Sequence, residues 1–357
     1  MKNIKIFLIT ILLFIITSCS SNKENYINAT VIRIISNVTL LDDKSNSQSK
    51  ITKIEVELDS GERVIIAQES NTNRSIGTPE EGDKVVLSEQ IVDENKTAYQ
   101  IIDMKRSGNT YFAIAFFVLC MSIIGGARGL IFFGILLFIF FVLVYMVLPL
   151  ISLGISPILL TLALSIFISW LINFLIQNNS KKQNLSITSN FLSLIIVTVF
   201  AYIFSKYGSF SSFLTKETTS SFIQKITPAG FIASSIILTS LGGIINVCTA
   251  TLNLSNEVNK NFPKANSQKL MMNLLKYSRQ SVFMNFIFIF TIYLGLAMPV
   301  MAYKYDVLTL NSFINTDIIS FYLIAVSIGG LGIISSSLIT SFLSTNFILE
   351  ERKKTKS

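Results

Sequence analysis

The stretch LIFFGILLFIFFVLVYMVLP, residues 130–149, decides the fold class of this chain. Its 20 residues include no charged side chain, and a helix of about that length crosses the roughly 30 Å hydrocarbon layer of a bilayer. Six further apolar runs lie at about 110–127, 155–177, 188–205, 227–252, 281–301 and 318–345. The sequence therefore predicts an α-helical polytopic membrane protein with about seven transmembrane helices.

Composition supports this prediction and limits the chemistry. Hydrophobic residues make up 51% of the chain and charged residues 14%, and the mean hydropathy is +0.59. The sequence has 0 histidines, which excludes Ser-His-Asp catalysis, histidine proton relays and the usual zinc ligand sets. The acidic residues Glu217, Glu257, Asp306, Asp317 and Glu350 all lie at or beyond the predicted membrane ends. We therefore expect no enzyme activity, no cofactor and no metal site.

Residues 1–18 have the composition of a signal peptide or an N-terminal anchor. Lys2 and Lys5 precede the apolar run 6–16, and Cys19 follows Ile-Thr-Ser as in a bacterial lipobox. One interpretation is cleavage before Cys19 and lipidation of its thiol. The alternative is an uncleaved short anchor in which the cysteine has no special role.

Residues 19–108 differ in character from the rest and predict a small extracytoplasmic β-domain. Apolar and polar residues alternate at 29–35, 51–58 and 63–67, and residues 84–87 predict a further short strand. Residues 59–62, Asp-Ser-Gly-Glu, are typical of a turn. These patterns predict an all-β barrel or sandwich of five or six strands, followed by a membrane domain at 109–345 and a basic cytoplasmic tail at 346–357.

The distribution of positive charge predicts the orientation. With the β-domain outside, the inner ends of the spans carry Arg128, Lys181, Lys182, Lys260, Lys264, Lys269, Lys276, Arg279, Arg352, Lys353, Lys354 and Lys356, against Lys206, Lys216, Lys225 and Lys304 outside. By the positive-inside rule, we expect a multi-pass protein of the bacterial cytoplasmic membrane with a cytoplasmic C-terminus. The net charge of +8 then reflects contact with the lipid bilayer, and we expect no nucleic-acid partner.

The fifth span carries a stripe of polar and small residues on one helix face. Its members follow one another at alternating four- and three-residue steps: Ser235, Thr239, Gly242, Asn246, Thr249 and Asn253. Exposing such a stripe to lipid costs free energy. It therefore either packs against other helices, with Asn246 hydrogen-bonding to a neighbouring helix, or lines a substrate path. In the last span, Gly332, Ser336, Thr340 and Ser344 recur every fourth residue, which predicts close helix packing.

The stretch between the fifth and sixth spans is rich in Asn and Lys. Leu270 and Leu274 stand at helical spacing there, which predicts an interfacial helix within 253–277. Arg279 and Gln280 stand at the mouth of the next span, and Asn285 lies deeper in it. Arg279 either reaches the lipid phosphates or guards a cytoplasmic opening.

The chain resembles the YibE/F family of multi-span bacterial membrane proteins. The resemblance rests on the exported β-domain, on Gly-Ala-Arg-Gly-Leu at 126–130 before a span that ends in Pro149, and on Gly154, Pro157 and Ser-Leu-Gly-Gly-Ile-Ile-Asn-Val at 240–247. It implies acidic residues at positions 246 and 280, where this chain has Asn246 and Gln280. An amide forms hydrogen bonds but carries no charge, so this departure weakens any mechanism that needs carboxylates there.

The resemblance implies a membrane protein with a transport-related role. We therefore expect a permease-like protein or an accessory of export or transport. The alternative is a membrane scaffold or sensor whose β-domain binds an envelope protein. Besides the lipid bilayer, the expected partner is either an envelope protein or a second copy of the chain.

Overall fold

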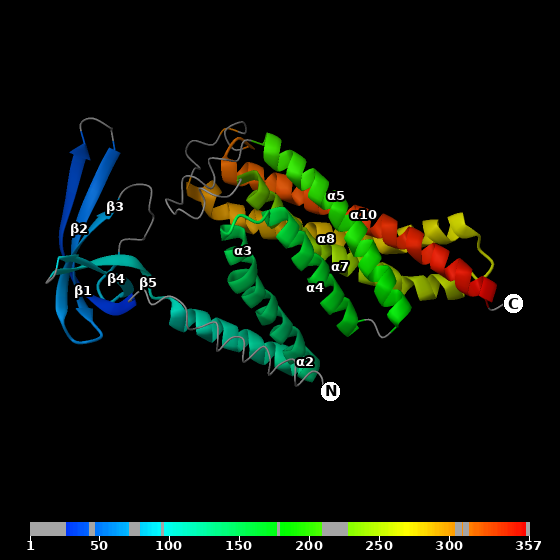
Figure 1. Cartoon of the computed structure of the whole chain (residues 1–357), viewed down its shortest axis with the longest axis horizontal. Helices are drawn as coiled ribbons and strands as arrows, with labels where there is room; N and C mark the ends of the chain where they lie inside the picture. The colour runs from blue at the N-terminus through cyan, green and yellow to red at the C-terminus, as the bar shows by residue number, and fades with distance from the viewer. Residues whose placement is uncertain are drawn as a thin grey trace. The chain divides into compact units, whose positions relative to one another are not determined.

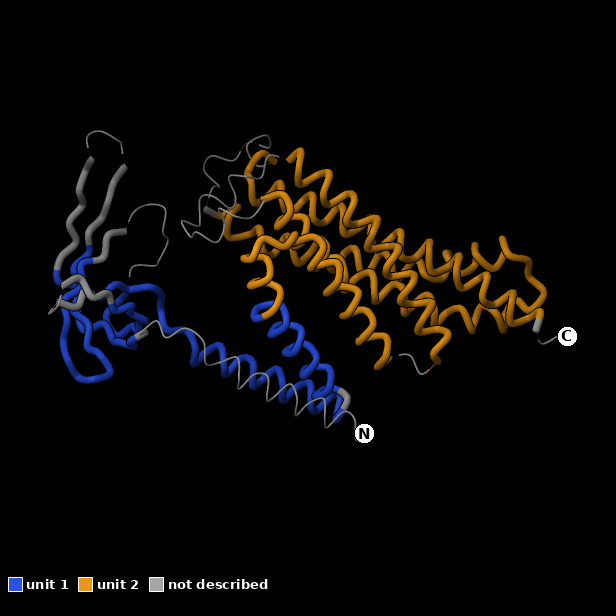
Figure 2. The backbone as a smooth tube through the Cα atoms, viewed as in Figure 1, with its two compact units in different colours: residues 1–145 blue, residues 146–357 orange. Residues whose placement is uncertain are grey.

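The computed structural model describes residues 26–42, 47–70, 79–93, 96–176, 179–208, 228–303, 309 and 314–354 (Figure 1). The chain divides into two compact units, Met1–Tyr145 and Met146–Ser357 (Figure 2). The predicted signal peptide or anchor and Cys19 lie outside the described residues. Each unit is taken by itself below.

The first unit begins with a five-stranded antiparallel sheet. The strands are β1 (Tyr26–Asp42), β2 (Ser47–Leu58), β3 (Arg63–Ser70), β4 (Lys84–Asp93) and β5 (Lys96–Met104), in the order β3-β2-β1-β4-β5. The long strand β1 pairs with β2 on one side and with β4 on the other, and the edge strands β3 and β5 also approach each other. This is the connectivity of a small, partly open Greek-key barrel, and it confirms the predicted all-β domain.

Alternation of side chains explains why these strands form. On β2, Ile54 and Val56 point into the core with 0% exposure, while Glu55 lies between them on the outer face and forms an ion pair with Arg33. The predicted turn at 59–62 is present. Gly61 adopts a φ of 85° there, a conformation that favours glycine, and its N–H donates to the Leu58 carbonyl at 2.8 Å.

The sheet is followed by a helical hairpin. Helix α2 (Ser107–Val142) is interrupted at Gly126, whose φ of 54° and ψ of −142° are not helical. The two arms contact each other through Phe117 and Phe133, whose ring centroids are 6.1 Å apart. A side chain at Gly129 would collide with the Met121 carbonyl oxygen, so only glycine permits this close return. The chain continues through η1 (Leu143–Val147) and α3 (Leu148–Ser152).

The second unit is a bundle built around one central helix. It contains α4 (Pro157–Ile176), α5 (Ser180–Tyr207), α7 (Pro228–Asn261), α8 (Ser267–Tyr303) and α10 (Asp317–Lys354), and α7 contacts the other four (Figure 1). In the most apolar part of α7, 67% of the residues are buried, compared with 22% in α8. Together with the hairpin, the described residues include 7 helices long and apolar enough to cross a membrane, which confirms the predicted number.

The prediction of a separate interfacial helix within 253–277 is wrong, although the residues from Ser267 onward are helical as their spacing predicted. Helix α7 instead continues to Asn261, and α8 begins at Ser267 after a short turn. Leu270 and Leu274 have 0% exposure, in a cluster with Val258 and Ile348. The apolar stripe that suggested a membrane surface is therefore covered by protein.

Helix α10 extends to Lys354, so most of the predicted tail is helical. Arg352 near its end donates to the Asn259 side-chain oxygen from Nε (2.9 Å) and Nη2 (2.7 Å). It also donates to the carbonyls of Phe262 and Ala265. These bonds fix the end of α10 against the α7–α8 turn.

Candidate functional site

The predicted polar stripe lies on the open side of α7. Between Pro228 and Asn253, the exposed residues of this helix are Thr239, Gly242, Asn246 and Asn253, and all four belong to the stripe. Its other two members, Ser235 and Thr249, are half-buried. The buried faces of α7 are instead mainly apolar, with Ile236, Ile237, Ile244 and Val247 at 0–1% exposure.

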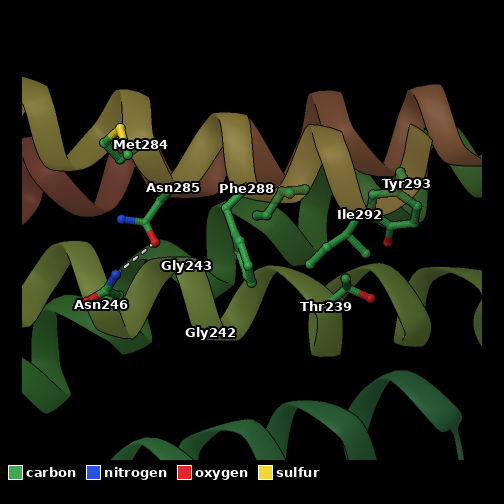
Figure 3. Close-up of a pocket in the computed structure, with 10 residues that line it drawn as sticks. Thr239, Gly242, Gly243, Asn246, Met284, Asn285, Phe288, Ile292 and Tyr293 are labelled. Carbon is green, nitrogen blue, oxygen red and sulfur yellow. Dashed lines mark hydrogen bonds between the residues drawn. The ribbon is translucent and has the colours of Figure 1, made fainter. Parts of the chain in front are cut away.

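A pocket of about 480 Å³ opens between this face of α7 and helix α8 (Figure 3). Helix α7 contributes Thr239, Gly242, Gly243 and Asn246, and α8 contributes Met284, Asn285, Phe288, Ile289, Ile292 and Tyr293. A Cβ added at Gly242 would meet nothing within 4 Å, which shows how open the pocket is on that side. The pocket is thus apolar along most of its wall and polar at its ends.

Two amides meet at one end of the pocket. Asn246 Nδ2 donates to Asn285 Oδ1 at 2.9 Å, as Figure 3 shows. Asn285 is 8% exposed, and its own Nδ2 donates to the Ser281 carbonyl at 2.8 Å, which holds the side chain in place. The sequence assigned these two asparagines to different features, and the structure brings them together across the α7–α8 groove.

The remaining predicted site residues lie apart from this pair. Arg279 and Gln280 are exposed on α8, and neither lines the α7–α8 pocket. Arg279 lines a second pocket, between α8 and α10. The predicted cytoplasmic mouth is therefore divided, with Asn285 in one pocket and Arg279 in the other.

Sequence reasoning missed the apolar wall that α8 contributes. Phe288, Ile289 and Ile292 follow Asn285 at helical spacing, and Tyr293 is 6% exposed beside Tyr322, with ring centroids 5.3 Å apart. In the sequence these residues look like any lipid-facing side chains. Their spacing from Asn285 was the available signal, since residues three, four and seven positions apart share a helix face.

A buried polar core on the other side of α7 was also not predicted from the sequence. Asn173 of α4 accepts a hydrogen bond from Ser186 Oγ of α5 at 2.7 Å and donates to the Ser169 carbonyl at 2.8 Å. Asn190 Nδ2 donates to Ser169 Oγ at 2.8 Å, and Ser189 bonds to Thr340 of α10. The four-residue spacing of Ser165, Ser169 and Asn173 was the signal for it.

The chemistry available in the α7–α8 pocket is that of neutral donors and acceptors. Its lining contains no Asp, Glu, Lys or Arg. Among the described residues, no group of three Cys, Asp or Glu side chains lies close enough to hold a metal ion. The arrangement can hydrogen-bond a polar group of a solute and bury its apolar part.

Comparison with known proteins identifies the family. A family model described as YibE/F-like protein matches residues 113–350. This match covers well over half of the chain, so the chain belongs to the YibE/F-like family. Neither a curated protein nor a solved structure matches it.

Proposed function

We propose that this YibE/F-family membrane protein is a permease-like, non-enzymatic component, and that the α7–α8 pocket is the core of its path for a small amphipathic solute. The Asn246–Asn285 hydrogen bond at the end of the pocket is the observation that supports this proposal most directly. Polar groups inside a bilayer are costly unless they meet protein, water or cargo. From Pro228 to Asn253, every exposed residue of α7 is polar or small, as expected for a helix that lines a water-filled path.

The dimensions and lining of the pocket indicate the kind of solute. Its volume of about 480 Å³ falls in the range of roughly 300–1,000 Å³ that is typical of small-molecule sites. The amide pair lies at one end, and Thr239 and Tyr293 lie at the other (Figure 3). Phe288 and Ile292 form the apolar wall between them. A small amphipathic molecule with a polar group at either end fits this lining better than a multiply charged one.

The experiment is a comparison of solute accumulation in cells that overexpress the intact protein, Asn246→Leu or Asn285→Leu. Thr291→Leu is the matched control, because Thr291 is exposed on α8 outside the pocket and its hydroxyl bonds only to carbonyls of its own helix. We expect the intact protein and the control to change the accumulation of the same solute class. Neither asparagine variant should do so at equal membrane levels. Unchanged accumulation in both asparagine variants would contradict the proposal.

We propose that the β-domain faces the outside and the C-terminus the cytoplasm of a bacterial cell. The lipobox-like sequence Ile-Thr-Ser before Cys19 supports lipidation of that thiol. Exposed Lys260, Lys264, Lys269 and Lys353 gather where Arg352 joins α10 to the α7–α8 turn, and positive charge favours the inside. A cytoplasmic reporter fused after Ser357 should be active. Activity of an exported reporter at that position would contradict this orientation.

A scaffold or sensor role is the second candidate. Ile65 is 63% exposed on β3 and Ile102 is 41% exposed on β5, and β3 and β5 approach each other at the two edges of the sheet. An exposed apolar side chain on each of two neighbouring edge strands is the feature that supports a protein-binding role for this domain. Crosslinking in cells should then recover an envelope protein with the intact chain and lose it with Ile65→Ser. Equal recovery with both chains would count against this role.

A further inference from the structure

A second pocket, of about 640 Å³, lies between α8 and α10. It shares no lining residue with the α7–α8 pocket, so its role does not depend on the proposed transport path. Two basic residues, Lys276 and Arg279, line this second pocket, and no acidic residue lines it. This combination distinguishes it from the uncharged α7–α8 pocket.

The two basic residues are available to a ligand. They are three positions apart on α8, which places them on the same side of the helix, and both are exposed. Neither residue takes part in the ion pair Arg33–Glu55 or in the ion pair Arg106–Asp103. An ammonium and a guanidinium side by side without a carboxylate attract an anion with several acceptor oxygens, and a phosphate group is such an anion.

A third donor lies in the wall of the same pocket. The Asn273 Nδ2 group is buried and has no hydrogen-bond partner among the described residues. By contrast, Ser337 on the α10 side already shares a hydrogen bond of 2.8 Å with Ser278. A buried N–H without a partner is costly, and an acceptor oxygen bound next to it would lower that cost.

The other side of the pocket is apolar and continues along the membrane span. From position 281 to position 300, α8 has no charged residue, so Arg279 stands at the boundary where lipid headgroups lie. Val282 of α8 and the exposed Ile334 and Leu338 of α10 line the pocket on that side. A free phosphate ion would leave these side chains uncovered, whereas the acyl chain of a lipid would pack on them.

We propose that the α8–α10 pocket binds an anionic phospholipid, with its phosphate at Lys276 and Arg279 and an acyl chain over Val282, Ile334 and Leu338. Basic pockets between transmembrane helices are known to bind acidic headgroups in this way. Because the lipid contacts both helices, it ties α8 to α10 and stabilises the folded bundle in proportion to its occupancy.

The test measures lipid binding to the purified full-length protein in mild detergent. Native mass spectrometry counts bound phosphatidylglycerol against phosphatidylcholine, and the midpoint of thermal unfolding is followed in parallel. The intact protein should prefer the anionic lipid. In the double variant Lys276→Gln/Arg279→Gln, the affinity for phosphatidylglycerol should fall by roughly tenfold or more. The variant should unfold at the same temperature as the intact protein when no lipid is added, because both side chains are exposed.

The control Lys260→Gln/Lys264→Gln removes the same charge from exposed positions outside the pocket and should bind like the intact protein. Three results would overturn the proposal: no preference for phosphatidylglycerol, an equal loss of binding in the control, or full stabilisation by inorganic phosphate alone. The last result would indicate a free anion in place of a lipid.

Discussion

Two polar regions of the helical bundle are built from the same residue types and differ in what surrounds them. In the buried core where α4 and α5 meet, Asn173 and Ser186 have 0% exposure and bond to each other. In the groove between α7 and α8, Asn246 is exposed beside a pocket and bonds to Asn285. An asparagine in an apolar helix is therefore no indication of role by itself. What distinguishes an asparagine that packs helices from one that lines a path is whether a pocket lies next to its side chain.

The glycines show the same contrast. A Cβ at Gly332 of α10 would lie 2.5 Å from Val197 Cγ2 and 3.2 Å from Ile244 Cδ1, whereas one at Gly242 would meet nothing within 4 Å. The Ser336 hydroxyl, one turn from Gly332, donates to the Ile244 carbonyl of α7 at 3.1 Å. Small residues on α10 thus permit close helix contact. Gly242 on α7 leaves room beside the pocket.

The largest effect is expected from Gly332→Ala. Val197 is β-branched and stiff, so it cannot move aside easily, and the added methyl group should cost about 1–3 kcal/mol of unfolding free energy. The matched change Gly242→Ala should be neutral or slightly stabilising, because alanine is the better helix former. Thermal unfolding of the purified proteins in mild detergent measures both. Similar midpoints for the two variants would remove the distinction between a closed core and an open groove.

A smaller effect is expected from the asparagines. Asn173→Ala removes the carbonyl acceptor of the buried Ser186 hydroxyl, which then keeps the weak sulfur partner Cys248 Sγ at 3.4 Å, and should cost about 1–2 kcal/mol. Asn246→Ala should cost about 0.5 kcal/mol or less, since water can replace the lost bond at an exposed site. The same unfolding measurement applies. A larger loss for Asn246→Ala would assign that residue to packing and weaken the proposed path.

The architecture could be predicted because its signals are local. The length of an apolar run predicts a membrane helix, and alternation along residues 51–58 predicts strand β2, whatever the rest of the chain does. The polar stripe on α7 was found in the same way, from its spacing. These features need no knowledge of which elements are neighbours.

The pairing of elements could not be predicted. The spacing of Leu270 and Leu274 fits a membrane surface as well as a protein surface, and only the fold shows Val258 and Ile348 covering them. Nothing in the sequence of α8 distinguishes Asn285 facing α7 from Asn285 facing another helix. A periodic pattern shows which residues share a face and leaves open what that face meets.

The smallest expected effect is a difference between two coupling energies, and it compares the two regions most directly. A double-mutant cycle on Asn173 and Ser186 isolates one interhelical hydrogen bond in the closed core, and a cycle on Asn246 and Asn285 isolates one in the groove. Side-chain hydrogen bonds in membrane proteins average about 0.6 kcal/mol, so we expect a coupling energy of about 1 kcal/mol for the core pair and about half of that for the groove pair.

A weak bond in the groove is what a path requires, because cargo has to displace it at little cost. Equal coupling in the two cycles would indicate that both pairs hold helices together, and the Asn246 side chain would then be closed to a solute.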